Sequence, residues 1–305
     1  MKLARRAVLG GMAVAFAAPS LARAQADWRA QHPVFNVAVV PNENQQAVLS
    51  RFQPLADYFR TALGFREVRL HTASDYAGII EAMRARRVDL AFFGPAAYAR
   101  AFEVTNGNTD PLVIELDENG TAFYHSVIVV RADSPFRTLE DLRGRTFAFV
   151  DPNSTSGFVV PNYFLHQQGT PAATYFGRTG FAGSHDNGAL VVVNGQFDSA
   201  AVWWRNENNS SFHRMMDRNL IPRDSLRIVW TSPRIPESPW TARKDLPQAM
   251  RDAIRQAMID MPARAPEQFR HILDGKSKGF LASNHDQFQP IIEMIRFNQQ
   301  QRRSG

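Results

Sequence analysis

Short runs of β-branched and aromatic residues alternate with longer segments of helical periodicity along most of this chain. The runs predict strands, and the segments between them predict helices. Such alternation is typical of an α/β fold with mostly parallel sheets covered by helices on both faces, in which ligands bind beyond the carboxyl ends of the strands. Strands are expected at residues 35–40, 68–71, 88–93, 112–116, 126–130, 146–150, 199–203 and 226–230, and helices at 45–63, 76–86, 95–101, 157–166 and 187–194.

Two extended segments, 124–130 and 229–234, are flanked by polar turns and are interpreted as connections between two lobes. The chain is long enough for two such lobes. The first lobe is then discontinuous, with residues 27–123 and 233–305, and helices expected at 245–261 and 286–298 complete it; the second lobe spans 128–228. Two connecting strands form a hinge, and closure about a hinge is a common way to enclose a ligand.

The first 24 residues have the pattern of a secretory signal. A basic start is followed by an apolar stretch at 7–21 and the small-residue triplet Ala22-Arg23-Ala24. This pattern predicts export and cleavage near Ala24. The adjacent Arg5 and Arg6 also suit the twin-arginine route, so the general secretory route and the twin-arginine route both stay open. The chain contains no cysteine, which argues against a lipid anchor.

Charge and composition exclude several classes of function. The formal net charge is +6, and residues 1–24 carry four basic and no acidic residues, so the remainder has a charge of +2. That small excess, without a basic cluster, argues against nucleic-acid binding. The absence of cysteine removes disulfides, thiolate metal sites and cysteine nucleophiles. No His and carboxylate cluster has metal-ligand spacing, so neither metal nor cofactor is expected.

The most informative segment follows the strand expected at 146–150. It reads Asp151-Pro152-Asn153-Ser154-Thr155-Ser156-Gly157 and leads directly into an apolar helical run. The free N–H groups of a first helical turn favour an anion, and the hydroxyls of Ser154, Thr155 and Ser156 would add donors for a tetrahedral oxyanion. The alternative is an ordinary helix cap, which needs one hydroxyl.

Three other residues are candidates for the same site. His185 opens a helical run after Gly183-Ser184, where a ring nitrogen could donate to an oxyanion, although a capped turn with an exposed histidine explains the pattern as well. Tyr76 and Tyr124 suit the wall of a small-ligand cleft, or an ordinary structural position.

These motifs together resemble the periplasmic phosphonate- and phosphite-binding proteins of ABC importers. The resemblance rests on the string from Asp151 to Pro161, on Asp75-Tyr76-Ala77-Gly78, on Tyr124-x-Ser126 and on Gly183-x-His185, in the same order as in the family. It implies a type II periplasmic-binding-protein fold, a membrane permease as partner and a periplasmic location. It also implies that Ser154, Thr155, Ser156 and His185 hold the oxyanion while Tyr76 and Tyr124 line the cleft.

The chain departs from the family where members that bind 2-aminoethylphosphonate use carboxylates. Arg205 and Ser238 fall at those two places, with Glu237 adjacent to the second. A cation facing an ammonium is repulsive in a closed cleft. The resemblance therefore implies phosphite or a phosphonate without an amine, or a ligand with a second acidic group near Arg205. Trp203, Trp204 and Trp240 stay open between pocket wall and core.

Two other functions remain as alternatives. A ligand-sensing module would need the same closing cleft and present the anion to a receptor. A secreted hydrolase would use a serine with His185, but the chain has no G-x-S-x-G elbow and no H-E-x-x-H motif. We expect a non-catalytic, monomeric binding protein.

Overall fold

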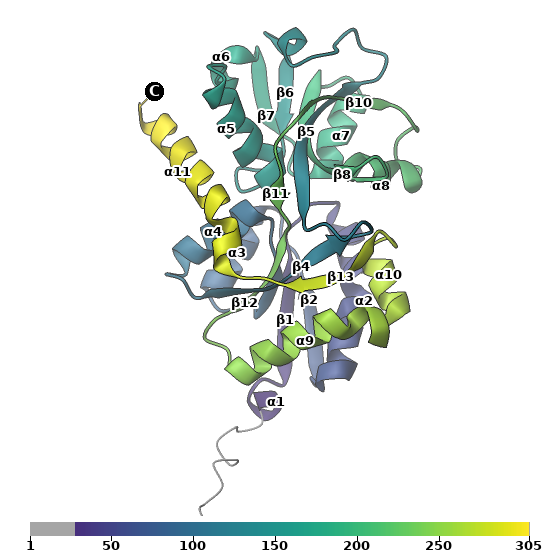
Figure 1. The fold of residues 1–305 in the computed structure, drawn as a ribbon, viewed down its shortest axis with the longest axis vertical. Helices are drawn as coiled ribbons and strands as arrows, with labels where there is room; N and C mark the ends of the chain where they lie inside the picture. Colours follow the sequence, from purple (N-terminus) through teal and green to yellow (C-terminus); the bar gives the residue numbers. More distant parts are fainter. Residues whose placement is uncertain (1–27, 305) are drawn as a thin grey trace, which may run out of the picture.

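The computed structural model describes residues 28–304, which form two sheets with helices on both faces of each (Figure 1). The predicted export signal at residues 1–24 lies outside this range. We call the six-stranded sheet with its helices the first lobe, and the seven-stranded sheet with its helices the second lobe. Within residues 28–304, no helix combines the length and the apolar character that a membrane crossing requires.

The first lobe has the strand order β13-β4-β12-β3-β1-β2. Apolar side chains pack on both of its faces, one under α2, α9 and α10 and the other under α3 and α4. Its strands are β1 (Val34–Val39), β2 (Glu67–His71), β3 (Leu90–Phe92), β4 (Thr109–Asp117), β12 (Pro239–Arg243) and β13 (Ser277–Ala282). Its helices are α1 (Trp28–Gln31), α2 (Gln45–Leu63), α3 (Tyr76–Arg84), α4 (Pro95–Val104), α9 (Gln248–Arg264) and α10 (Pro266–Ile272).

The second lobe has the strand order β10-β5-β8-β6-β7, with β11 beside β5 and β9 beside β8. Its strands are β5 (Phe123–Arg131), β6 (Thr146–Phe149), β7 (Arg178–Phe181), β8 (Ser199–Asn206), β9 (Asn209–Ser210), β10 (Leu226–Thr231) and β11 (Ile235–Pro236). Its helices are η2 (Glu140–Leu142), η3 (Thr155–Val159), α5 (Val160–Gln167), α6 (Ala172–Tyr175), α7 (His185–Val193) and α8 (Ser211–Asp217).

The two-lobed α/β fold agrees with the prediction, but both sheets are mixed where we expected mostly parallel ones. Parallel pairs join β1 to β2 and β3, and β6 to β7 and β8. The pairs of β12 and β13 in the first lobe and of β5 and β10 in the second are antiparallel. Parallel neighbours need a crossover connection, whereas β5, β10 and β12 lie next to the passages of the chain between the lobes.

The expected hinge segments are themselves strands of the second lobe. Residues 124–130 lie within β5 and 229–234 begin within β10, and these two strands pair with each other. The chain passes between the sheets just before β5 and again between β10 and β12, where β11 still pairs with Phe123 and Tyr124.

The C-terminal helix does not simply complete the first lobe. After η4 (His285–Phe288), α11 (Gln289–Ser304) packs against α5 and η3 of the second lobe as well as α4 of the first (Figure 1). Ile291, Met294 and Ile295 recur at helical spacing and join the core around Phe158. A helix with one apolar stripe packs wherever apolar surface is available, and here both lobes supply it.

Helix boundaries in the first lobe follow local chemistry. The side chain of Asn44 accepts hydrogen bonds from the N–H groups of Gln46 and Ala47 at the start of α2, and Gly64 ends the helix with φ of +74°. Between them, Val48, Phe52, Leu55, Phe59 and Leu63 form the buried stripe.

The turn after β6 depends on a glycine for close packing. A Cβ atom on Gly157 would lie 2.4 Å from the Val150 Cβ and 2.7 Å from the Ser154 Oγ, which no real side chain tolerates. At Gly188, inside α7, the nearest atom would be the Val202 Cγ1 at an ordinary 3.4 Å. The first glycine is thus required by sterics, and the second is not.

We predict that Gly157→Ala lowers the free energy of unfolding by about 1 to 3 kcal/mol through overpacking. Gly188→Ala is the matched control, since alanine suits a helix interior better than glycine by about 0.5 to 1 kcal/mol. Urea unfolding of both variants measures the difference. Equal stabilities would show that the turn can rearrange around a methyl group.

Candidate functional site

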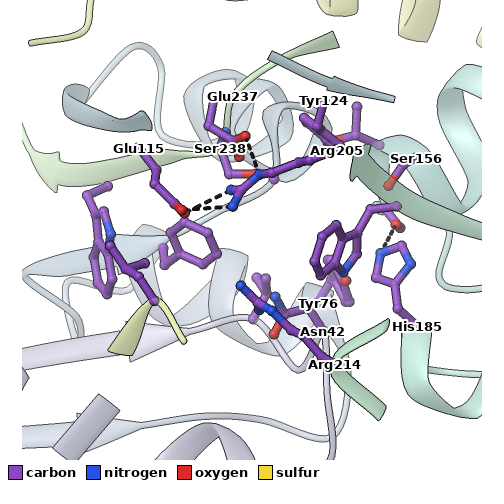
Figure 2. Close-up of a pocket in the computed structure, with 18 of the residues that line it drawn as sticks. Asn42, Tyr76, Glu115, Tyr124, Ser156, His185, Arg205, Arg214, Glu237 and Ser238 are labelled. Carbon is purple, nitrogen blue, oxygen red and sulfur yellow. Dashed lines mark hydrogen bonds and ion pairs between the residues drawn. The ribbon is translucent and has the colours of Figure 1, made fainter. Parts of the chain in front are cut away.

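A buried pocket lies between the lobes at the carboxyl ends of β1, β2, β3, β6 and β7. Its volume is about 70 Å³, enough for a ligand of a few non-hydrogen atoms, since a water needs about 10 to 15 Å³ on this measure. Figure 2 shows the side chains that surround it. All the predicted site residues line it, namely Tyr76, Tyr124, Ser154, Thr155, Ser156, His185, Arg205 and Ser238.

The three consecutive hydroxyls lie at the start of the turn of π-helix η3, directly after β6. Ser154 caps this turn, because its Oγ accepts a hydrogen bond of 3.1 Å from the Gly157 N–H. The sequence left a helix cap and a set of oxyanion donors as alternatives for this segment. In the structure, the helix cap and the three hydroxyls lie on the same segment. All three serine and threonine side chains are buried at the pocket. Turns of π-helix recur at functional sites, where they present side chains that a regular helix would not.

A helix N-terminus of the first lobe faces this turn. The helix α4 begins with Gly94-Pro95, and Gly94 lines the pocket. The Thr155 Oγ1 accepts a 2.8 Å hydrogen bond from the Ala96 N–H, so its own hydrogen is directed elsewhere. This bond joins the lobes and places two positive helix ends at one point. The sequence signal was present, since a proline after glycine at the end of a strand often opens a helix.

The two tyrosines are neutral hydrogen-bonding groups. Burial raises the pKa of Tyr76, and a hydrogen bond with Ser154 opposes the shift. Burial and the nearby Glu237 raise the pKa of Tyr124, whose hydroxyl interacts with those of Thr155, Ser156 and Ser238. Both phenols thus keep their protons at neutral pH, and each is tied to the hydroxyl cluster.

His185 is a buried, neutral imidazole at the start of α7. Burial lowers the pKa of His185 to about 3, and its Nε2 lies 3.4 Å from the Ser154 Oγ. Its Nδ1 has no hydrogen-bond partner among the residues that the structure describes. Buried polar atoms are usually satisfied, so this orphan nitrogen indicates where a ligand oxygen or hydroxyl would bind. The alternative of an exposed histidine is wrong, since only 4% of the side chain is accessible.

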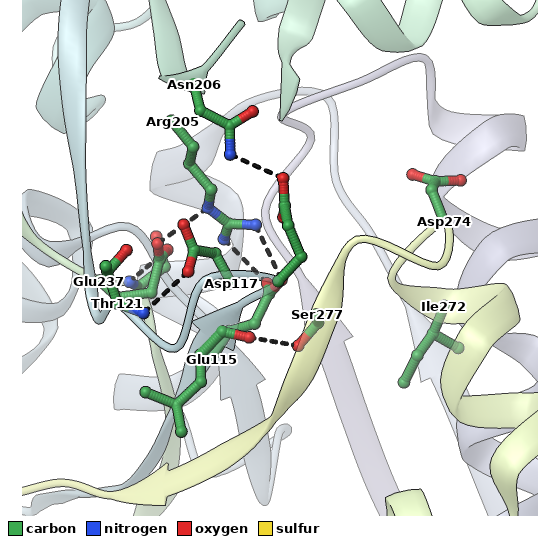
Figure 3. Close-up of polar contacts among 12 residues, drawn as sticks. Glu115, Asp117, Thr121, Arg205, Asn206, Glu237, Ile272, Asp274 and Ser277 are labelled. Carbon is green, nitrogen blue, oxygen red and sulfur yellow. Dashed lines mark hydrogen bonds and ion pairs between the residues drawn. The ribbon is translucent and has the colours of Figure 1, made fainter. Parts of the chain in front are cut away.

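Arg205 lies in the pocket, but it is not the unpaired cation that the sequence suggested. Its Nη1 and Nη2 each donate to a Glu115 oxygen at 2.8 Å, and its Nε donates to Glu237 Oε2 at 3.0 Å (Figure 3). The other Glu237 oxygen accepts from the Ser238 N–H at 2.8 Å. Two carboxylates, those of Glu115 and Glu237, are therefore present at the pocket, and both form ion pairs with Arg205.

Comparison with known proteins identifies the family of the chain. Residues 37–290 match the model of the ABC transporter, phosphonate, periplasmic substrate-binding protein family. The chain belongs to this family. It is 32% identical to the phosphonates-binding periplasmic protein of Escherichia coli K12, over 89% of this chain and 78% of the relative. It is 33% identical to the phosphate-import protein PhnD of Mycolicibacterium smegmatis, over 80% and 74%.

Solved structures show the same fold. A binding component of an ABC phosphonate transporter from Pseudomonas aeruginosa superposes with a TM-score of 0.77 at 30% identity, covering 88% of this chain and 87% of that one. PhnD1 of Prochlorococcus marinus, solved in complex with methylphosphonate, superposes with a TM-score of 0.73 at 24% identity, covering 87% and 98%. These neighbours support the type II fold expected for the phosphonate-binding family.

A second ionic network, which sequence reasoning missed, spans the cleft of this family member. Glu43 of the first lobe forms ion pairs with Arg51 of its own lobe, with Arg214 of α8 and with Arg218, which follows α8 directly. Asp274 pairs with the same two arginines, Arg214 and Arg218. We call these five residues the Glu43 network. Arg51 and Arg214 also line the pocket, yet neither lies in a recognisable motif.

Aromatic rings form the remaining wall. Phe52, Phe92 and Trp240 contact one another, with ring centroids 5.1 to 6.2 Å apart, and Trp203 faces the pocket from β8. Trp203 and Trp240 are thus both buried and part of the pocket wall. The two interpretations that the sequence left open, pocket wall and core, both hold for these residues. No group of three or more His, Asp or Glu side chains within residues 28–304 is arranged to hold a metal ion.

Asp186, next to His185, is buried at the start of α7 near the Glu43 network. Burial and the charge of Glu43 raise its pKa to about 7, although Arg218 and Arg214 oppose the shift. Between pH 4 and pH 7 the folded state thus binds more protons than the unfolded state, and Asp186 reduces stability as the pH rises through that range. The lowered pKa of His185 acts in the opposite direction between pH 3 and pH 6.5.

We predict that Asp186→Asn is more stable than the parent at pH 8, by about 1 to 3 kcal/mol, and that this gain vanishes near pH 4. The contribution of His185 is common to both proteins and cancels in the difference. Urea unfolding at pH 4, 6 and 8 measures it, with Asp57→Asn on the exposed side of α2 as the control for the exchange. A gain that does not change with pH would contradict the raised pKa.

Proposed function

We propose that this chain captures a small phosphorus oxyanion, a phosphonate or phosphite, between its lobes and presents it to the membrane permease of an ABC importer. The observation that carries the proposal is the convergence of the Ser154-Thr155-Ser156 hydroxyls, the Ala96 N–H end of α4 and the neutral His185 at one buried pocket. A tetrahedral oxyanion offers several acceptors in different directions, which suits such a set of donors. In this proposal the chain acts as a monomer. Its two lobes are joined at Phe123 and at residues 231–239, where the chain passes from one sheet to the other.

A hydrolytic function fits the site less well. A nucleophilic serine needs a histidine base that is itself held by a third group. His185 Nδ1 has no such partner within the described part of the chain, and the pKa of about 3 disfavours its protonation. These features support binding without catalysis.

The proposal predicts that the protein is stabilised by phosphite and by methylphosphonate. A ligand that binds only the folded state raises the free energy of unfolding by about 2.7 kcal/mol at a concentration one hundred times its Kd. Thermal unfolding with phosphite, methylphosphonate, phosphate and sulfate tests this, and the absence of any shift with the three phosphorus oxyanions would refute the proposed function. A shift with phosphate alone would assign the site to phosphate.

The proposal also separates the roles of two neighbouring serines. Ser156→Ala should weaken methylphosphonate binding by about ten- to a hundredfold, because a hydrogen bond to a charged oxygen contributes about 1.5 to 3 kcal/mol. Its stability should fall less than that of Ser154→Ala, because Ser154, not Ser156, caps η3. Ser154→Ala should lose about 1 kcal/mol of stability in addition to affinity. Calorimetry and urea unfolding give both quantities, and unchanged affinity in Ser156→Ala would exclude it from the site.

We further propose that residues 1–24 direct export and are removed near Ala24. The mass of the protein recovered from the periplasm should then correspond to a chain that begins at Gln25 or close to it. Retention of residues 1–24 in that fraction would contradict the proposal. Replacement of Arg5 and Arg6 by lysines should stop export only if the twin-arginine route is used.

A further inference from the structure

The pocket has two chemically different halves. One half holds the hydroxyls of Ser154, Thr155 and Ser156 together with His185, and we call it the donor half. The other half, here the distal half, is walled by the rings of Phe52, Phe92 and Trp240, which contact one another, and by the ring of Trp203, which lies against the guanidinium groups of Arg205 and Arg214. A ligand whose oxyanion occupies the donor half would direct its substituent toward these rings.

Charges also surround the distal half, but the protein satisfies them itself. Arg205 is held by Glu115 and Glu237, and Arg51 and Arg214 belong to the Glu43 network. These ion pairs involve four arginines and four carboxylates in all, so their formal charges cancel. The four arginines are Arg51, Arg205, Arg214 and Arg218, and the four carboxylates are Glu43, Glu115, Glu237 and Asp274.

The acceptors of the two pocket-lining carboxylates are already engaged. Three of their four oxygens accept from Arg205, and the fourth accepts from the Ser238 N–H. The guanidinium of Arg214 also lies 4.8 Å from the centre of the Trp203 ring, and that of Arg51 lies 4.5 Å from the Phe52 ring. A ligand cation would therefore meet carboxylates and aromatic faces that protein cations already occupy.

We propose that Arg205 is an internal counter-cation that determines specificity, so that the distal half accepts a short, uncharged, apolar substituent and rejects an ammonium group. The inference rests on the proposed function, because it assumes that the oxyanion binds in the donor half. The ligand class is then phosphite and short alkylphosphonates. A charged substituent would give up its hydration on entering the pocket without finding an unpaired partner there.

Two isosteric ligands test this directly. Propylphosphonate and 2-aminoethylphosphonate differ only in the terminal methyl or ammonium group. The parent protein should bind propylphosphonate at least tenfold more tightly in calorimetry. An equal or reversed preference would overturn the inference, and this measurement needs no variant.

Arg205→Met removes the cation while keeping an unbranched side chain, which leaves Glu115 and Glu237 free to hold an ammonium. We expect the preference for propylphosphonate to shift toward 2-aminoethylphosphonate by at least tenfold in this variant. Arg243→Met is the matched control, since Arg243 is a largely buried arginine paired with Asp89 and Asp245 and does not line the pocket. An unchanged ratio in Arg205→Met would also overturn the inference. If that variant does not fold, Glu237→Gln provides the second test. Its preference for propylphosphonate over 2-aminoethylphosphonate should be stronger than that of the parent.

Phosphite separates this inference from the proposed function. Because phosphite has no organic substituent, its affinity should change little in Arg205→Met relative to the shift between the two isosteres. If the parent binds neither phosphite nor any phosphonate, the proposed function fails. If it binds phosphite but does not distinguish the isosteres, only the role of Arg205 fails.

Discussion

The convergence of helix N-termini at the carboxyl ends of parallel strands is the constraint on which the site depends. β2 leads to α3 and Tyr76, β3 leads to α4 and Gly94, β6 leads to η3 and Ser154, and β7 leads to α7 and His185. A parallel arrangement brings these ends to one edge of each sheet, and the two edges face each other. Positive helix ends and free N–H groups are thereby concentrated in one buried place, where an anion is favoured without any arginine or lysine.

The antiparallel strands contribute a different set of side chains to the same pocket. Glu115 comes from near the end of β4, Arg205 from β8 and Trp240 from β12, each of which has at least one antiparallel neighbour, so these residues approach from the sides of the pocket. Buried ion pairs contribute little net stability, because the loss of hydration offsets the attraction between the charges. We assign these ion pairs a different role, which is to determine the ligand substituent that can bind beside them. The cancellation of charge in the distal half therefore matters for ligand choice.

The sequence predicted the donor half of the pocket but only part of the distal half, where Arg205 and Ser238 were expected and Glu115 and Arg51 were missed, for a physical reason. Ser154 and Tyr76 follow expected strands, so strand–helix alternation places them at a ligand crevice. His185 follows β7, which was not expected, and was selected because it opens a helical run. Glu115 and Arg51 lie inside a strand and a helix, where no local pattern distinguishes a pocket residue from a core or surface residue. Glu115 and Arg51 become pocket residues only in the folded chain, where β4 and α2 face β8 and α8 across the cleft.

Fold elements were missed where local signals oppose the final structure. β12 begins with a proline and β13 contains a glycine with φ of +155°, and both residues weaken a strand pattern. Tertiary pairing with β4 on either side outweighs these preferences. The mixed character of the first sheet follows from these strands, and that of the second sheet follows from β5 and β10.

Closure and ligand capture are coupled through bonds that cross the cleft. The Ala96 N–H donates to Thr155, the Tyr76 N–H to Asp151 at 3.4 Å, and the His185 N–H to the Asn42 carbonyl at 3.1 Å. Each of these bonds needs both lobes, and the same approach buries His185 Nδ1 without a partner. Closing therefore gains hydrogen bonds but isolates a polar atom and brings positive helix ends together. In the proposed function, an oxyanion in the donor half would relieve both costs in the closed arrangement, and its binding would favour that arrangement.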